Sequence, residues 1–287
     1  MKLIASLFPM LLMALLLGNS QPSRLAPQSY PFSVQKTGHG PRSLIFIPGF
    51  ACSSQVWDDT KANYEDQFTC YTLTMAGFAG LKPQPNPNFA QWEAAIAHYI
   101  QQNHLVKPIL VGHSMGGGLA LAIAADYPEL IGKIVVVDAL PCLAALTNPT
   151  FQAKPINDCS ALSQQLSTMT DDQFYQRQKM TMSQLVADTA KQALVLSWSL
   201  QSDRKTMAAL YCDYMNTDLR QKIKAVSCPS LILLEPAFEP VKPAVEAQYK
   251  YLTNTTIRYA TKGLHFIMYD DKAWYLRQLQ PFITNHQ

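Results

Sequence analysis

The sequence predicts an α/β fold in which helices cover both faces of a mostly parallel sheet. Short runs rich in Val, Ile and Leu alternate with segments of helical spacing after residue 30, a pattern typical of buried parallel strands and their crossover helices. One long stretch, residues 141–225, holds no convincing strand and indicates several helices. The composition allows a sizeable core, because 48% of the 287 residues are hydrophobic and only 15% are charged. We therefore expect one large α/β domain with a helical cap inserted between its strands.

The elements before residue 130 are marked by apolar runs and by turn residues. The run 43–47 stops at a Pro-Gly pair, as a buried strand does, and the run 68–75 ends in a glycine-rich turn. Apolar residues then recur with helical spacing from Phe89 to Tyr99, and Asn88 is a suitable N-cap. Strands are therefore expected at 30–36, 43–47, 68–75 and 108–111, and helices at 88–102 and 119–125.

The elements after residue 130 follow the same alternation on either side of the helical stretch. Apolar or alternating runs predict strands at 134–137, 230–234 and 255–259, and helices are expected at 244–251 and 270–283. Within the helical stretch, helices are expected at 161–169, 171–180, 181–198 and 204–214. We therefore divide this part of the protein into a core, formed by 30–140 and 226–287, and a cap, formed by 141–225.

Residues 1–20 have the layout of a secretory signal peptide. Lys2 precedes an apolar run, 3–17, and small residues follow it, which suits cleavage before Gln21. The run has about 15 residues, fewer than the roughly 20 that span a bilayer, so a cleaved signal is favoured over an uncleaved anchor. We expect a secreted or periplasmic protein with a short linker at 21–29 and no membrane span after cleavage.

Six cysteines follow the expected cleavage point, and an even number permits disulfides in an exported protein. They are Cys52, Cys70, Cys142, Cys159, Cys212 and Cys228. The sequence does not choose among the pairings, but a bond between Cys142 and Cys159 is attractive because these two bracket a predicted loop. Buried free thiols are the alternative. No CxxC or Cys/His spacing suggests a zinc site, so no metal is expected.

The residues Gly112-His113-Ser114-Met115-Gly116 match the pattern G-x-S-x-G, between a buried strand and a helix of small residues. A serine in such a turn has a strained backbone and a hydroxyl lifted above the sheet, and the flanking glycines avoid collisions. The helix N-terminus points at the site, where it stabilises a developing oxyanion. With the preceding strand PILV, the sequence GHSMGG resembles the α/β-hydrolase superfamily, over essentially the whole chain from about residue 30.

The resemblance implies an eight-stranded sheet and a catalytic triad in the chain order nucleophile, acid, base, with Ser114 as the nucleophile. It also implies an oxyanion hole made of two backbone N–H groups. One would belong to Met115, directly after the nucleophile, and the other to Phe50, in the turn after the second expected strand. The family often has His-Gly in that turn, where this chain has Pro48-Gly49, and the glycine still supplies the backbone freedom.

His265 is the expected general base among the six histidines. It lies in the sequence GLHF, after the last expected strand and before the last helix, where the family carries its catalytic histidine. A histidine in such a loop can hydrogen-bond Ser114 and take its proton during attack. His113 belongs to the turn itself, and the remaining histidines lie in loops, on an outer helix or at the tail.

The acid that orients the base has more than one candidate. In most of the superfamily it follows the seventh strand, where this chain has Phe238 with Glu235 and Glu239 on either side. Asp138 directly follows the strand at 134–137, and some family members, including one branch of haloalkane dehalogenases, carry the acid there. The strand-end position favours Asp138 over Glu235 or Glu239. A structural aspartate that braces the turn, or a serine–histidine dyad, stays open.

These residues predict hydrolysis of a carboxylic ester, lactone, thioester or amide through an acyl-enzyme intermediate. A cap rich in methionine and aromatic residues is suited to an apolar acyl substrate, although ordinary helix packing accounts for most of them. Serine as the nucleophile argues against epoxide hydrolases and dehalogenases, which use a carboxylate. A cofactor-free haloperoxidase or lyase with the same triad, and a non-catalytic binding protein on this fold, are the alternatives.

Charge excludes one class of partner. The net charge of +3 is small for this length and no dense Lys/Arg run occurs, so nucleic acid is not an expected ligand. No organic cofactor is indicated by any motif. The substrate and the oligomeric state are not determined by these patterns.

Overall fold

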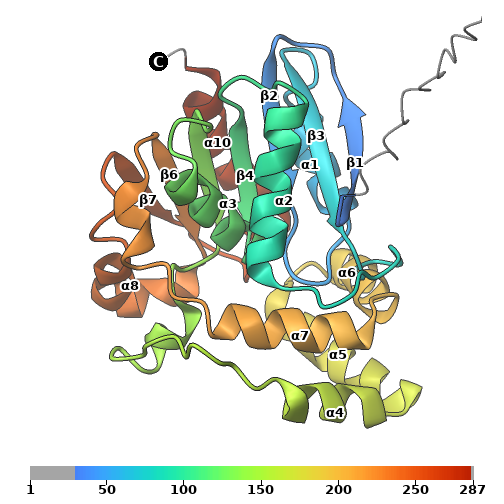
Figure 1. The fold of residues 1–287 in the computed structure, drawn as a ribbon. Helices are drawn as coiled ribbons and strands as arrows, with labels where there is room; N and C mark the ends of the chain where they lie inside the picture. Colours follow the sequence, from blue (N-terminus) through green and yellow to red (C-terminus); the bar gives the residue numbers. More distant parts are fainter. Residues whose placement is uncertain (1–29, 286–287) are drawn as a thin grey trace, which may run out of the picture.

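The sheet holds seven strands within residues 30–285, the part of the chain that the computed structural model describes. Their order across the sheet is β1-β3-β2-β4-β5-β6-β7 (Figure 1). β1 pairs antiparallel with β3, and the other neighbours pair in parallel. The strands are β1 (Phe32–Thr37), β2 (Arg42–Ile47), β3 (Phe68–Met75), β4 (Ile109–His113), β5 (Lys133–Val137), β6 (Ser230–Leu234) and β7 (Thr255–Tyr259). The mostly parallel sheet is confirmed, with seven described strands against the eight that the resemblance implies.

The expected signal peptide, 1–20, and the linker, 21–29, lie outside the described residues. Within 30–285, no helix has both the length and the apolar character needed to cross a membrane.

Both faces of the sheet carry a hydrophobic core, because side chains alternate along each strand. The helices that cover them are α1 (Asp58–Lys61), α2 (Phe89–Gln102), α3 (Met115–Asp126), α8 (Lys242–Gln248), α9 (Ile267–Asp270) and α10 (Lys272–Thr284). In β2, Ile45 and Ile47 pack into the core with α2 and α3, whereas Leu44 and Phe46 pack into the core with α10. Figure 1 shows α2 and α3 in front of the sheet and α10 behind it.

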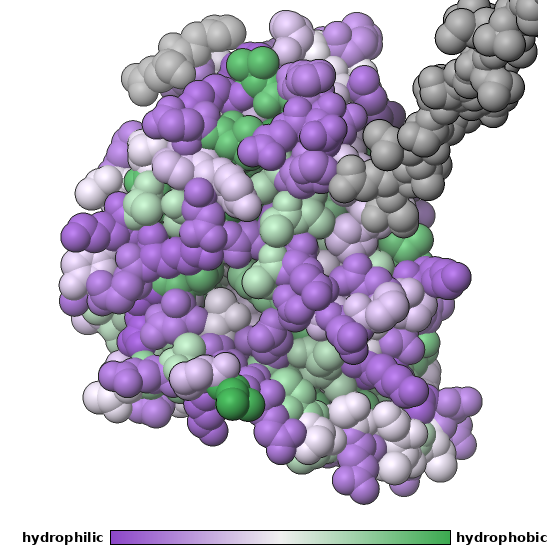
Figure 2. Space-filling view, in the orientation of Figure 1, coloured by the Kyte–Doolittle hydropathy of each residue, from purple (hydrophilic) through white to green (hydrophobic). Residues whose placement is uncertain are grey.

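Four further helices lie between β5 and β6 in the chain and below the sheet in Figure 1. They are α4 (Ser160–Thr168), α5 (Asp171–Leu185), α6 (Thr189–Leu200) and α7 (Arg204–Met215). The face shown in Figure 2 is mostly hydrophilic over these helices, with isolated apolar side chains. The insertion is helical, as expected, and it covers one edge of the sheet.

Side-chain caps fix where two of the helices begin. Asn88 caps α2 as expected, because its side chain accepts a hydrogen bond from the backbone N–H of Gln91 at 2.9 Å. The expected boundary between helices at 180 and 181 is wrong, since α5 continues to Leu185 and α6 begins at Thr189. The cause is Asp188, whose carboxylate accepts from two N–H groups of the first turn of α6.

The disulfide joins Cys159, at the start of α4, to Cys212 in α7, with 5.7 Å between their Cα atoms. The expected bond between Cys142 and Cys159 is therefore wrong. Cys142 is a free thiol and only 1% exposed, and its backbone N–H donates to the side chain of Gln248 at 3.0 Å. Burial beside α8 keeps Cys142 in the core, away from the two cap helices that the bond connects. The other free cysteines are buried as well: Cys52, Cys70 and Cys228.

Candidate active site

Ser114 occupies the turn between β4 and α3. Its backbone has φ 52° and ψ −123°, a region that side chains with a Cβ rarely adopt. Its N–H donates to the carbonyl of Val137 at 2.8 Å, which ties the turn to the end of β5. A Cβ on Gly116 would lie 2.3 Å from the carbonyl oxygen of Ile47, so only glycine lets the turn pack this closely against β2. The arrangement is a tight strand-to-helix turn of the kind the motif predicts.

The loop after β2 lies against the same turn. A Cβ on Gly49 would come within 2.7 Å of Nδ1 of His113 and 3.2 Å of Cβ of Ser114. The next residue, Phe50, lines the same cavity as Ser114, and Met115 directly follows Ser114 at the start of α3. Within residues 30–285 the N–H groups of Phe50 and Met115 have no hydrogen-bond acceptor. Two backbone donors are thus left for a group bound at Ser114.

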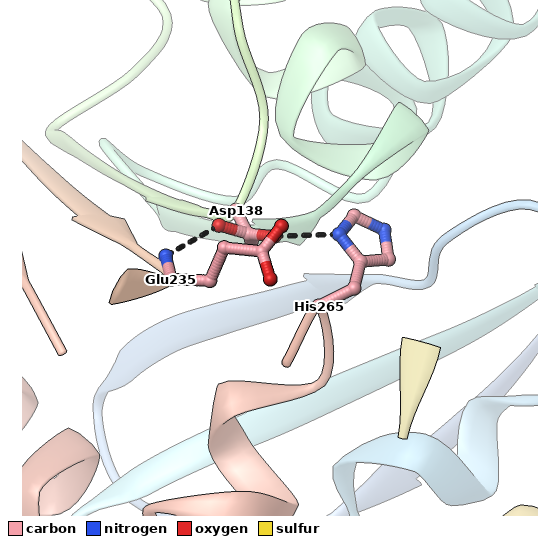
Figure 3. Close-up of side chains that lie close together, drawn as sticks. All are labelled: Asp138, Glu235 and His265. Carbon is pink, nitrogen blue, oxygen red and sulfur yellow. Dashed lines mark hydrogen bonds and ion pairs between the residues drawn. The ribbon is translucent and has the colours of Figure 1, made fainter. Parts of the chain in front are cut away.

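His265 lies in the loop between β7 and α9, and its ring meets Asp138. Nδ1 of His265 is 2.6 Å from Oδ2 of Asp138 (Figure 3). The side chain of His265 is 21% exposed, whereas that of Asp138 is fully buried. Because the carboxylate binds Nδ1, it fixes the neutral ring in the tautomer whose Nε2 is free to accept a proton.

Asp138 follows β5 directly and has a positive φ of 51°, which turns its side chain toward the neighbouring loops. Its N–H donates to the carbonyl of Leu233 at 2.7 Å. Its second oxygen, Oδ1, accepts from the backbone N–H of Glu235 at 2.7 Å. Both carboxylate oxygens therefore have a donor, which compensates the burial of the charge.

Glu235 and Glu239, the alternative candidates for the acid, lie in different surroundings. Figure 3 shows the carboxyl group of Glu235 beside the carboxylate of Asp138, on the side of His265, with no hydrogen bond drawn to the ring. Burial, reinforced by the negative charge of Asp138, raises the pKa of Glu235 to about 7. Glu239 is exposed and lies 3.7 Å from Lys242, outside the cavity that Ser114 lines. Of the three carboxyl groups, that of Asp138 contacts the imidazole.

The protonation of the two histidines follows from their surroundings. Burial acts to lower the pKa of His265, but the hydrogen bond to Asp138 and the charges of Asp138 and Glu235 outweigh it and raise that pKa. Burial and the neighbouring His265 hold the pKa of His113 well below its ordinary value. His113 is therefore neutral, and its Nε2–H donates to the carbonyl of His265 at 3.1 Å. His113 thus braces the loop that carries His265.

Asp270, in α9, is a positioning residue that the sequence patterns did not reveal. Its carboxylate accepts from the N–H of Leu264, next to His265, at 2.9 Å. It also accepts from the N–H groups of Ala187 at 3.0 Å and Asp188 at 3.1 Å, in the link between α5 and α6. One carboxylate therefore ties the loop of the base to the cap. The position of Asp270 just after that loop can be read from the sequence, but its donors in the cap, Ala187 and Asp188, lie 83 and 82 residues away and could not be.

A cavity of about 440 Å³ is lined by several of these residues. Ser114, His265, Asp138, Glu235 and Phe50 line it, and most of the remaining wall comes from α5 to α7. Ser114 and His265 face the same space without a direct hydrogen bond between them in this structure. A more open hollow of about 800 Å³ lies elsewhere, against Pro149 and Tyr251, and none of these residues lines it.

Oxygen and nitrogen atoms of Asp138, Glu235 and His265 lie within 4.8 Å of one another. In the described residues this is the grouping closest to a metal-ligand set. Both Asp138 oxygens already accept a hydrogen bond, one from Nδ1 of His265 and one from the N–H of Glu235. The arrangement suits proton transfer better than coordination of a cation.

Comparison with known proteins places these observations in a family. The chain matches the α/β-hydrolase fold family over residues 42–234. It is 25% identical over 261 residues to a pimeloyl-[acyl-carrier protein] methyl ester esterase of Shewanella oneidensis, which covers 89% of this chain and 95% of that protein. This relative supports a hydrolase of the ester-cleaving type.

Solved structures show the same fold. An enol-lactonase from Burkholderia xenovorans is similar with a TM-score of 0.73 and 12% identity, covering 88% of this chain and 96% of that one. An esterase from Exiguobacterium antarcticum gives a TM-score of 0.72 with 15% identity over 88% and 96% of the two chains. With the sheet, the turn at Ser114 and the family match over most of its length, the chain belongs to the α/β-hydrolase fold family.

Proposed function

We propose that the protein is a serine hydrolase that cleaves a carboxylic ester through an acyl-enzyme intermediate. The observation that carries the proposal is the contact between His265 and the buried Asp138, in the same cavity as a serine with a strained backbone. A buried carboxylate, a partly exposed imidazole and a serine at a helix N-terminus are the parts that acyl transfer needs. The esterase of Shewanella oneidensis supports an ester as the substrate class.

In the proposed reaction, Oγ of Ser114 attacks the ester carbonyl while Nε2 of His265 accepts its proton. Asp138 holds the ring through Nδ1 and stabilises the imidazolium that forms. The N–H groups of Phe50 and Met115 donate to the carbonyl oxygen as it becomes an oxyanion. The imidazolium then protonates the leaving alkoxide, and water, deprotonated by the same ring, releases the acid. Lactones and thioesters offer the same carbonyl to this machinery.

The test is turnover of a panel of p-nitrophenyl acyl esters by the wild-type protein and by Ser114→Ala. We expect hydrolysis by the wild type and loss of about three or more orders of magnitude in the variant, because the nucleophile is removed. A fluorophosphonate probe should label the wild type at Ser114 and leave the variant unlabelled. Absence of both turnover and labelling would indicate a binding protein on this fold instead.

We also propose that residues 1–20 direct export and are removed. The disulfide between Cys159 and Cys212 supports an oxidising compartment, where such bonds persist. N-terminal sequencing of protein recovered outside the cytoplasm of the expressing cell should start near Gln21. An intact N-terminus on protein retained in the cell would contradict export.

A further inference from the structure

One stretch of the cavity lining, on α5, carries polar side chains. α5 faces the cavity with Arg177, Gln178 and Thr181, which lie on one side of the helix together with Met182 and Leu185. The hydroxyl of Thr181 donates to the carbonyl of Arg177, so Arg177 and Gln178 are the ones that can still donate to a ligand. Apolar side chains form much of the remaining lining and are called the apolar wall: Leu143, Leu162, Leu166, Val195, Met207 and Phe238.

Arg177 is the sole Lys or Arg among the residues that line this cavity. It is half-buried, and within the described chain its guanidinium has no ion pair, hydrogen bond or ring partner. Other partly buried arginines are paired: Arg204 contacts Asp171 at 2.6 Å, and Arg220 contacts Asp218 at 2.7 Å. A partly buried guanidinium without a protein carboxylate is open to a bound anion, which would pair with its charge.

Gln178, the next residue, has an unused donor in the same place. It is only 7% exposed, and its Oε1 accepts from the hydroxyl of Ser199 at 2.8 Å. That bond leaves the amide NH2 group of Gln178 without an acceptor in residues 30–285. Because Gln178 lines the cavity, this NH2 group is available to an oxygen atom of a bound ligand.

The helix that carries these donors is tied to the loop of the base. The N–H of Phe266, next to His265, donates to the carbonyl of Leu185 at the end of α5 at 3.2 Å. Arg177 lies two helical turns before Leu185, a rise of about 12 Å along the helix. The donors are thus set at the far end of the cavity from the reacting groups, at a distance that an extended acyl chain can span.

We propose that the natural substrate is an ester that carries a carboxylate of its own, which Arg177 and Gln178 bind at the α5 wall. This inference rests on the proposed ester hydrolysis and names the substrate class. A guanidinium matches a carboxylate through two parallel hydrogen bonds, and the neighbouring amide supplies a third donor. The apolar wall accommodates the chain between the carboxylate and the ester group.

The first experiment compares kcat/KM for the monomethyl and dimethyl esters of adipic, suberic and sebacic acids. A second series uses alkanoic acids esterified either with glycolic acid or with methanol. In the glycolic acid esters the free carboxylate lies on the alcohol side of the ester bond. We expect the wild type to favour the charged ester in one series, and Arg177→Gln to reduce that preference by about 10- to 100-fold. Arg177→Lys keeps the positive charge but loses the paired N–H groups of the guanidinium, so it should retain part of the preference for the charged ester.

Lys179→Gln is the matched control, because it removes a positive charge from the exposed side of the same helix. Lys179 stacks over the ring of Tyr175 and does not line the cavity. The control should leave the preference for the charged ester unchanged. A fall of equal size in both variants would indicate a general effect of charge and would overturn the proposal.

Binding of adipate and suberate to Ser114→Ala, measured by calorimetry, provides a readout without turnover. Arg177→Gln in that background should weaken binding by about 10- to 100-fold, while Lys179→Gln should not. If neutral esters are hydrolysed but no charged ester is preferred and Arg177→Gln changes nothing, the carboxylate site is wrong and the hydrolase stands. If Ser114 is never acylated but the diacids bind through Arg177, the hydrolase is wrong and the site stands.

Discussion

Two carboxyl groups, those of Asp138 and Glu235, lie near one imidazole, but only that of Asp138 contacts it. Asp138 bonds Nδ1 directly, whereas Glu235 acts on the ring through its charge. Because burial and Asp138 raise the pKa of Glu235 to about 7, its charge appears over the same pH range in which a histidine titrates. Glu235 and His265 therefore influence each other's titration, and the pH dependence of the proposed reaction reflects both groups.

Glu235→Gln should shift the acid limb of the kcat/KM profile to lower pH. The charge of Glu235 helps to raise the pKa of His265, so its removal lowers that pKa. The neutral imidazole, which takes the proton of Ser114 in the proposed reaction, then persists to lower pH. The measurement is a pH–rate profile with a p-nitrophenyl ester, with the exposed Glu239→Gln as a control that should not move it.

Asp138→Asn separates the two candidate acids in the same assay. We expect a loss of about 10⁴-fold in kcat, because an amide cannot stabilise the imidazolium or hold the reactive tautomer. Glu235→Gln should change the plateau rate by less than about tenfold. The reverse order of losses would make Glu235 the acid of the triad.

At the scale of helices and strands, continuous apolar runs bounded by turn residues identified the strands well. β3, β6 and β7 have the bounds expected from sequence, since their ends are set by local turn chemistry. The start of α6 was missed because the polar stretch around Thr181 looks like a break, although its hydroxyl bonds within α5 to the carbonyl of Arg177 at 3.0 Å.

Part of the candidate site was predictable from the sequence, because several of its residues lie where predicted strands end. Ser114, His265 and Asp138 stand at strand ends or in the loop before a helix, which parallel sheets bring to one edge. Asp270 and Arg177 have no such marker, because their roles depend on how the cap helices dock. Pairing of the cysteines depends on the same docking, and the sequence could not choose the partner of Cys159.

The bond between Cys159 and Cys212 should stabilise the cap helices rather than the chemistry. It ties α4 to α7 across 53 residues, and such a cross-link restricts the unfolded chain. The double variant Cys159→Ser/Cys212→Ser should lose about 2–4 kcal/mol of unfolding free energy in denaturant titrations, if the chain unfolds in one step. Its ester hydrolysis at low temperature should stay near that of the wild type, and a loss of activity without a loss of stability would contradict this assignment.

At the scale of the whole molecule, a partly buried charge cluster joins the core to the segment that returns from the cap. Lys222, which follows α7, lies 3.2 Å from Glu93 in α2 and 2.7 Å from Asp126 at the end of α3. Glu93 is only 5% exposed. Burial, together with the hydrogen bond and charge of Asp126, raises the pKa of Glu93 to about 7, although Lys222 opposes this.

This cluster predicts how stability changes with pH. Because the pKa of Glu93 is higher in the folded than in the unfolded chain, protonation of Glu93 stabilises the fold. This contribution to the free energy of unfolding is complete below the ordinary pKa of 4.5 and is lost as the pH rises through about 7. Relative to Glu93→Gln, the wild type should lose stability between these two pH values. Denaturant midpoints of both proteins at several pH values test this, and parallel curves would contradict it.

The backbone of Ser114 also bears on how this protein evolved. Its positive φ costs the fold about 1–3 kcal/mol, a large share of the roughly 5–15 kcal/mol that separates native from unfolded chains. Glycine adopts that conformation freely, so Ser114→Gly should melt at a higher temperature than Ser114→Ala, which keeps the clash. Selection for stability alone would favour glycine at this position. The proposed use of the hydroxyl as the nucleophile gives a reason to accept this strain, at the expense of thermal tolerance.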